Sequence, residues 1–306
     1  MLEDILPENL YTLIQKYVNI NKLYEIRLRI DNPIVLNISN SICSINFNGL
    51  CNVNNGIICS KEIIEKVVAL ASDNSVYAIE NQLKCGYITA SCGIRIGVAG
   101  EFVESKDLIT NLKNICSLNI RLPHNVIGCS KRIMPLIFDE QKRVYNTLIL
   151  SPPGAGKTTM LRDIITNFSH IKGFINCLVI DERFEIIGKY QKKNYFELSS
   201  NIDVLYGGNK SYSIKCGVRS LAPNIIFTDE IATKDDANSI VYAKNCGVNV
   251  VATMHAKSLT DFTSKIELDE LFTKHIFDRF VVLSNRKGVG TIEGVYDKNY
   301  RLLYGE

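Results

Sequence analysis

Residues 151–159 combine glycines, a lysine and two threonines at a spacing that can hold a phosphate group. Glycines let the backbone curl around an anion without Cβ clashes, and amides at the start of a following helix attract negative charge. A lysine at this point reaches the β- and γ-phosphates, and the next hydroxyl can ligate Mg²⁺. The pattern predicts a P-loop for ATP and Mg²⁺. Its nucleotide-binding residues are Pro153, Gly154, Ala155, Gly156, Lys157, Thr158 and Thr159, and Thr158 is also a candidate metal ligand.

This loop departs from the common pattern at one position. The first glycine of G-x-x-x-x-G-K-[ST] is replaced by Ser151. The position lies where a strand ends, and a small side chain suffices there, so we expect the change to be tolerated. The alternative, a chance turn with an exposed lysine, fits poorly with an apolar run before the loop and helical periodicity after it.

Two further apolar runs stop abruptly at acidic residues. One ends at Asp181 and Glu182, with Glu185 three residues further on, and the other ends at Asp229 and Glu230. The carboxyl ends of parallel strands lie at one edge of a sheet, where a P-loop also lies. We therefore expect these acids to converge on the nucleotide, with Asp181 and Asp229 as candidate metal residues. The alternative is a solvated strand end that happens to be acidic.

His255 also follows an apolar run, at the same expected edge of the sheet. It can sense a γ-phosphate by hydrogen bonding. A single histidine at a strand end is more often structural, and the residues alone leave both interpretations open.

The composition favours a folded protein with two domains. The chain has 306 residues, of which 46% are hydrophobic and 22% charged, and a net charge of +3 is too small to indicate a nucleic-acid or lipid partner. Its 10 cysteines include no C-x-x-C pair, and the spacing of Cys85 and Cys92 matches no metal or disulfide framework. The acidic opening of the chain predicts no signal peptide. We therefore expect reduced thiols and a cytoplasmic location.

The order of the patterns predicts an α/β fold in two parts. Residues 1–125 mix helical and strand patterns, with a helix over 1–22 and a glycine-rich hairpin over 86–103, and predict a smaller α+β domain. Residues 126–143 are expected to form a connecting helix, and 206–213 an exposed loop. From 144 to 306, apolar runs alternate with helical segments, which predicts a mostly parallel sheet of RecA-like P-loop type. These runs cover 146–151, 176–181, 224–229, 248–255 and 279–284.

The ordered set of motifs resembles the secretion ATPases, the ring-forming RecA-like motors of type II and type IV secretion and of pili. The acidic box at 181–185 matches their Asp box, and His255 matches their His box. The resemblance implies that the Asp box holds magnesium and that Glu230 activates water. It also places Glu182, Glu185 and His255 among the catalytic residues. Most members carry Gly-Glu where this chain has Asp229 and Glu230.

The match narrows to a sporulation branch of this family in endospore-forming bacteria. Segments such as "EIRLRIDNP", "CGIRIGVAGEF" and "IDERFEI" recur in the expected order from about residue 25 to 295. Asp31 stands where glycine is usual, and Phe184 where serine is usual. The resemblance implies a mother-cell ATPase that powers or assembles a secretion-like channel towards the forespore. It implies a homo-oligomer, a hexameric ring, docked peripherally on an integral-membrane partner.

Arginines completing such a site often come from a neighbouring subunit. By resemblance Arg95 and Arg121, in or beside the N-terminal domain, are the candidates, and Arg219 is a further one. Each could equally form an ordinary salt bridge. Arg27 and Arg29 lie on one face of an expected strand and could serve an interface.

Other functions remain open at this stage. One is a type II or type IV secretion or pilus ATPase outside sporulation. A second alternative is a small-molecule kinase. Such enzymes usually carry an arginine-rich lid, and the sequence shows no arginine-rich insertion. A DNA-directed RecA-like ATPase would favour a basic groove or aromatic stacking loops, and a net charge of +3 without any Trp gives this little support. No nucleic-acid partner is therefore expected.

Overall fold

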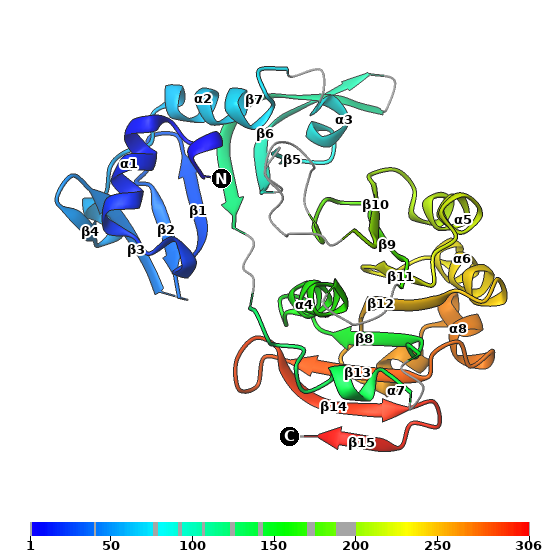
Figure 1. The fold of residues 1–306 in the computed structure, drawn as a ribbon. Helices are drawn as coiled ribbons and strands as arrows, with labels where there is room; N and C mark the ends of the chain where they lie inside the picture. The colour runs from blue at the N-terminus through cyan, green and yellow to red at the C-terminus, as the bar shows by residue number, and fades with distance from the viewer. Residues whose placement is uncertain are drawn as a thin grey trace. The chain divides into compact units, whose positions relative to one another are not determined.

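The chain folds into two compact units in a computed structural model (Figure 1). The structure describes residues 2–39, 41–75, 79–90, 94–105, 108–122, 126–139, 143–169, 175–187 and 200–305. Contacts divide the chain into a unit of residues 1–124 with 188–195 and a unit of 125–187 with 196–306. No helix in these described ranges is long and apolar enough to cross a membrane.

The first unit is an antiparallel sheet with helices packed on it. The strand order is β4-β3-β2-β1-β7-β6-β5, and a core that includes Ile14, Ile26 and Val67 lies between sheet and helices. From β1, Leu23, Ile26 and Leu28 enter this core, and the register shift between Leu23 and Glu25 interrupts the alternation of a regular strand. The elements are η1 (Leu2–Asp4), α1 (Glu8–Tyr17), η2 (Ile20–Lys22), β1 (Leu23–Arg29), β2 (Val35–Ile38), β3 (Ser41–Asn46), β4 (Gly49–Cys51), η3 (Val53–Asn55), α2 (Lys61–Ala71), α3 (Glu80–Leu83), β5 (Tyr87–Thr89), β6 (Arg95–Ser105) and β7 (Leu108–Arg121).

The second unit is built on a sheet in the order β10-β9-β11-β12-β8-β13-β14-β15. The pairs from β10 to β13 are parallel, and β14 and β15 extend the sheet as antiparallel strands. The elements are η5 (Met134–Leu136), β8 (Thr147–Ser151), α4 (Lys157–Ser169), β9 (Cys177–Asp181), β10 (Ile202–Tyr206), α5 (Lys210–Leu221), β11 (Ile225–Thr228), α6 (Lys234–Asn245), β12 (Asn249–His255), α7 (Leu259–Thr263), η6 (Ile266–Leu268), α8 (Asp269–Thr273), β13 (Arg279–Ser284), β14 (Thr291–Asp297) and β15 (Leu302–Gly305).

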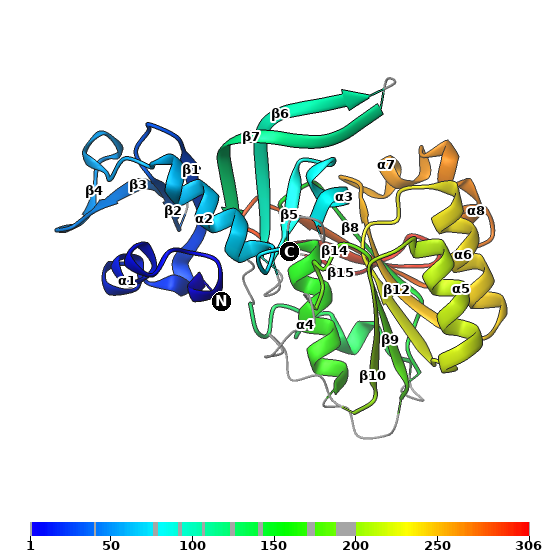
Figure 2. The ribbon, with the colours of Figure 1, turned by 90° about the horizontal axis from the view of Figure 1, so that it is seen from above.

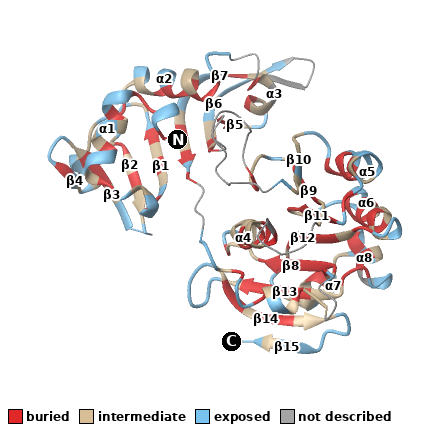
Figure 3. Ribbon diagram, in the orientation of Figure 1, coloured by how far each residue is buried: buried red, intermediate tan, exposed pale blue. Residues whose placement is uncertain are grey.

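Helices cover both faces of the second sheet, so its central strands are buried on both sides. In Figure 2, α4 lies on one side of the strands and α5 and α6 lie on the other. Alternate residues of β8 enter two cores: Ile149 packs with α4, whereas Leu148 and Leu150 pack with α5 and α6. Figure 3 shows β8 buried along its length. This explains the continuous apolar runs, and the predicted α/β fold class is confirmed.

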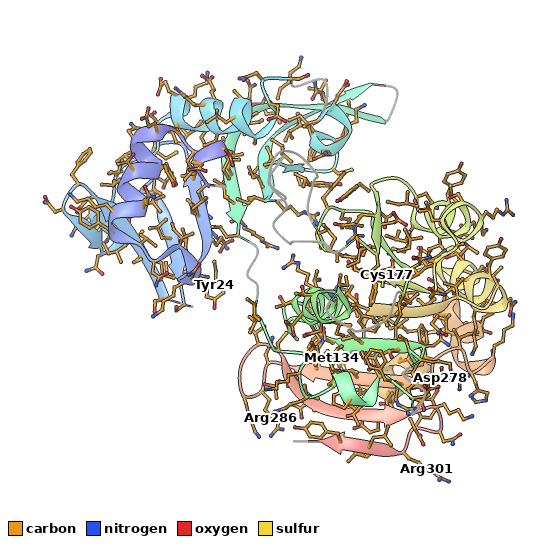
Figure 4. The ribbon with its side chains drawn as sticks, in the orientation of Figure 1. Tyr24, Met134, Cys177, Asp278, Arg286 and Arg301 are labelled. Carbon is orange, nitrogen blue, oxygen red and sulfur yellow. The ribbon has the colours of Figure 1, made fainter. Side chains whose placement is uncertain are left out.

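The helix expected over 126–143 is wrong for the residues that the structure describes there. Residues 127–133 form turns, and only the 3-10 helix η5 follows. Pro135 has no amide hydrogen to continue a helical ladder. The amides of Gly128 and Ser130 donate instead to the Asp163 carboxylate, at 2.8 and 2.7 Å. Ile133 and Ile137 are fully buried in the core beside α4. Met134 is labelled in Figure 4.

Two other local expectations need correction. Residues 206–213 are not a loop throughout, because α5 starts at Lys210, capped by the Asn209 side chain, which accepts from the Tyr212 amide. The helix expected over 1–22 is instead three pieces: Pro7 separates η1 from α1, and extended residues Val18 and Asn19 separate α1 from η2. The five apolar runs of the second unit are confirmed as strands β8, β9, β11, β12 and β13, and the hairpin predicted over 86–103 is the β5–β6 pair.

Candidate nucleotide-binding site

The P-loop links buried strand β8 to helix α4 and has two residues with positive φ angles. Gly154 has φ +72° and Gly156 has φ +88°, a region that side chains with a Cβ rarely adopt. A Cβ on Gly156 would come within 3.0 Å of Val289 Cγ1, whereas a Cβ on Gly154 would point into open space among the described residues. We call this open space beside Gly154 the glycine cradle.

Ser151 and Ala155 hold the two ends of this loop. The Ser151 side chain is fully buried and donates to the Pro152 carbonyl at 2.9 Å, so the residue that replaces the usual glycine fits its place. The Ala155 carbonyl accepts from the Gly290 amide at 3.1 Å, which joins the loop to the segment before β14. Pro153 is exposed, and Thr158 and Thr159 are half-buried in the first turn of α4.

Lys157 lies at the first position of α4 beside His255, the last residue of β12. Its ammonium Nζ is 3.0 Å from His255 Nε2 and 3.3 Å from Nδ1. Burial lowers the pKa of Lys157, and the carboxylates of Glu230, Asp229 and Glu185 oppose that effect. The P-loop lysine is therefore held among carboxylates, where it can receive an anionic ligand.

His255 also contacts Glu230, with 3.3 Å between Nε2 and Oε1. One ring nitrogen cannot donate and accept at once, and an ammonium group only donates. If Nε2–H donates to Glu230, Lys157 can donate only to Nδ1, at 3.3 Å, and its 3.0 Å approach to Nε2 is then not a hydrogen bond. His255 thus connects the P-loop lysine to the glutamate that follows β11.

Asp181 ends β9 and organises the turn after it. Its Oδ1 accepts from the amides of Glu185 and Ile186, at 2.8 and 3.1 Å, and its Oδ2 accepts from the amide of Ile187 at 2.8 Å. The side chain is fully buried. Asp181 therefore shapes the turn that carries the other acids of this box.

Arg162 and Phe184 connect the same turn to neighbouring elements. Arg162 Nε donates to the carbonyls of Glu185 and Ile186, at 3.1 and 3.0 Å. Burial lowers the pKa of Arg162, and the charge of Asp181 opposes this. The Phe184 ring stacks on Tyr206 at the end of β10, with 6.0 Å between centroids. The turn is thus fixed by α4, β9 and β10 together.

Asp229 follows β11 and is buried to 2% exposure. Burial raises its pKa to about 7, and the nearby charge of Lys210 opposes the rise. Its Oδ1 has no hydrogen-bond partner among the residues that the structure describes. An orphaned buried carboxylate oxygen next to a P-loop fits a divalent cation with its water shell.

The magnesium site predicted from sequence is consistent with these groups. In the described ranges, no group of three His, Cys, Asp or Glu residues could hold a metal by itself. Mg²⁺ commonly binds through one or two protein oxygens together with substrate phosphates and waters, so such a cage is not needed. Thr158 and Asp229 would supply the protein oxygens.

Glu230 contacts residues from several elements of the site. Its Oε2 pairs with Arg183 Nη1 at 2.6 Å, and its Oε1 faces His255. Its carbonyl accepts from Lys210 Nζ at 2.8 Å, and Lys210 Nζ is 3.6 Å from Glu182 Oε2. The two acidic strand ends are therefore linked in this unit through Arg183 and Lys210, while their convergence on a nucleotide stays a prediction.

Sequence reasoning missed Arg183 and Lys210. Arg183 lies inside the acidic box itself, so its partner could have been sought among the neighbouring carboxylates. Lys210 was assigned to an exposed loop, although Asn209 before it is a typical helix N-cap. Its side chain is 4% exposed.

A cavity of about 370 Å³ lies beside Glu230 and His255. Residues 231–232 line it near Glu230, and residues 264–268 form another part of its wall. It lies within the second unit and gives access to the side of the site where these two side chains meet.

The arginines predicted from sequence are carried by other elements of the chain. Arg95 and Arg121 are directly opposite each other on β6 and β7 of the first unit, and the Arg95 guanidinium lies 4.4 Å from the Tyr87 ring centroid. Arg219 is on α5 and donates to the Tyr242 hydroxyl of α6 at 3.3 Å. Arg27 pairs with Glu25 at 3.1 Å.

The fold and this cluster define the class: the second unit is a RecA-like P-loop domain of the type found in secretion ATPases. The chain has a TM-score of 0.58 to the pilus retraction motor PilT with bound ADP, at 14% identity over 90% of this chain and 76% of that one. To the Legionella pneumophila ATPase DotB the TM-score is 0.55, at 14% identity over 86% and 72% of the two chains.

The chain belongs to the family "Sporulation stage III, protein AA", whose sequence profile matches residues 2–303. It is 30% identical to stage III sporulation protein AA of Bacillus subtilis (strain 168) over 312 aligned positions, which cover 99% of this chain and 96% of the relative. A more distant relative is the uncharacterised protein ycf45 of Cyanidium caldarium, 23% identical over 52% of this chain and 46% of that one.

Proposed function

We propose that the chain is a Mg²⁺-dependent, secretion-type ATPase of endospore formation, which acts in the mother cell to power or assemble a channel to the forespore. Membership of the sporulation family and the secretion-ATPase fold support this assignment. The observation that carries the chemistry is the convergence of Lys157, His255 and Glu230 beside an open glycine cradle.

In this proposal the chain's own groups divide the work. The P-loop amides and Lys157 bind the β- and γ-phosphates, and His255 donates to Glu230 and so orients its carboxylate. Glu230 accepts a proton from the attacking water, and the acids Glu182 and Glu185 set the charge around it. When bound, Mg²⁺ would neutralise charge on the transferred phosphate, held by Thr158 and Asp229. For Asp181, its three amide contacts favour a positioning role over direct metal binding.

The test of nucleotide binding is a thermal-shift measurement. ATP–Mg²⁺ at about 100 times its Kd should raise the free energy of unfolding by about 2.7 kcal/mol. Lys157→Ala should remove most of that shift, whereas Lys215→Ala, on the exposed side of α5, should keep it. An equal shift in wild type and the Lys157 variant would contradict the assignment. Hydrolysis that does not depend on added DNA separates this function from a DNA-directed ATPase.

Assembly into a ring, a hexamer by resemblance, is part of the proposal. Arg95 and Arg121 would then complete the site of a neighbouring subunit, and an integral-membrane partner would bring the protein to the membrane. A mixture of the Lys157→Ala chain with an Arg95→Ala, Arg121→Ala chain should hydrolyse ATP although neither does so alone. Full activity of the double-arginine variant by itself would rule out the shared site.

A further inference from the structure

Glu230 has a backbone conformation that its side chain disfavours. Its φ angle is +40°, in the left-handed region where a residue with a Cβ is strained by about 1–3 kcal/mol. Such a conformation persists only when the surrounding structure holds it. The site must therefore contain groups that fix the backbone of this glutamate.

Two side chains hold the peptide groups of Glu230 from opposite sides. The amide donates to Thr253 Oγ1 at 2.8 Å, and the carbonyl accepts from Lys210 Nζ at 2.8 Å. Thr253 is on β12 and Lys210 is at the start of α5, so both are carried by regular elements. The direction of the Glu230 side chain depends on these two bonds.

A lysine that is both buried and at the start of a helix is unusual. Its residue is 3% exposed, and it is the first residue of α5. Burial disfavours an ammonium group, and so does the positive end of a helix dipole. Acidic groups lie near this ammonium group. Glu182 Oε2 is 3.6 Å from Nζ, and the charge of Lys210 opposes the rise in the pKa of Asp229 that burial causes.

We propose that Lys210 is a positioning residue, which fixes the carbonyl of Glu230 and thereby aims the Glu230 carboxylate at the nucleotide. Through Glu182, the same ammonium group ties the acidic turn after β9 to the one after β11. This inference rests on the proposed ATPase function. In this proposal Lys210 acts through Glu230 and takes no direct part in the reaction.

The test measures kcat and KM for ATP hydrolysis together with the Kd for ADP. Lys210→Met should lower kcat about 10- to 100-fold, because a small misplacement of a reacting group has effects of that size. KM and the ADP Kd should stay within about twofold, since the phosphate cradle is untouched. Lys215→Met, an exposed lysine on the same helix, is the matched control and should behave as wild type.

Two further variants cover the case in which Lys210→Met does not fold. Lys210→Arg keeps the buried positive charge but shifts the donor, and Thr253→Val removes the bond on the other side of Glu230. Both should lower kcat selectively, and the double variant Lys210→Arg, Thr253→Val should lose less than the product of the two effects because they act on one residue.

The outcomes separate the inference from the proposed function. If wild type fails to hydrolyse ATP, the proposed function is wrong. If wild type is active and either Lys210 variant retains its kcat, the inference is overturned. An ADP Kd that weakens by the same factor as kcat would also overturn it, because Lys210 would then support nucleotide binding in general.

Discussion

Asp181 ends β9 and Asp229 follows β11, and the parallel sheet buries both carboxylates. The oxygens of Asp181 accept three backbone N–H groups, whereas Oδ1 of Asp229 lacks a hydrogen-bond partner among the described residues. The same sequence signature, an apolar run ending in acids, thus builds a turn in one place and leaves an open ligand oxygen in the other. The difference lies in the chain that follows, since only the box after β9 folds back over its aspartate.

The largest difference in ATP hydrolysis is expected between variants of the two glutamates that follow these aspartates. Glu230→Gln keeps the size of the side chain but removes the base, so hydrolysis should fall about 100- to 10,000-fold while ATP still binds. Glu182→Gln should have a much smaller effect, because Glu182 lies 3.6 Å from Lys210 Nζ and acts on Glu230 through that lysine. Steady-state hydrolysis and equilibrium nucleotide binding measure the two. A wild-type rate in Glu230→Gln would transfer the role to Glu182 or Glu185.

For stability, unlike for activity, the residue after β9 should matter more than the residue after β11. Asp181→Ala leaves three backbone amides, two of them buried, without their acceptor and should lower the free energy of unfolding by about 3 kcal/mol. Asp229→Asn, which removes a buried charge and breaks no bond at Oδ1, should not lower it at pH 8. Urea unfolding of both variants measures this. Equal losses would mean that both aspartates are structural.

The pH dependence of stability sharpens the same contrast. Burial raises the pKa of Asp229 from 3.8 to about 7, so between these values the unfolded chain releases a proton that the folded chain keeps. The contribution of Asp229 to the free energy of unfolding therefore falls as pH rises from about 4 to about 7. Asp229→Asn should match wild type near pH 4 and exceed it at pH 8. A difference between the two proteins that does not change with pH would contradict the raised pKa.

Arg183→Ala should have the smallest effect on stability. The ion pair with Glu230 has an N–O distance of 2.6 Å, but the arginine side chain is 42% exposed, and pairs of that kind contribute only about 0.5 kcal/mol. Arg286→Ala, which breaks a surface pair with Glu293, is the matched control. A loss well above that of the control would show that Arg183 holds the acidic turn in place.

Sequence reasoning predicted the strands of the second unit because their residues are apolar on both faces, a pattern that depends little on distant contacts. It also predicted the P-loop, whose glycines have the positive φ angles that the motif requires. It failed where a distant side chain decides the local structure. Gly128 and Ser130 bond to Asp163, more than 30 positions away, and no local pattern reveals that.

The site was predicted as a set of residue types, and its connections were not. That Glu230 meets Arg183, His255 and Lys210 follows from the order of strands β9, β11 and β12 and from the start of α5. The two departures from the family pattern, Asp31 and Phe184, have φ angles of +58° and +57°. Side chains with a Cβ are therefore accommodated at both positions in a left-handed conformation, which the sequence alone did not indicate.

Asp163 gives the connecting segment a mechanical role. The chain that arrives from the first unit is fastened by Gly128 and Ser130 to one carboxylate of α4, and the Ser130 hydroxyl adds a third bond to it at 2.6 Å. Lys157 is the first residue of that same helix. A force on the connecting segment would therefore act on α4, and a displacement of α4 would act on the connecting segment in return.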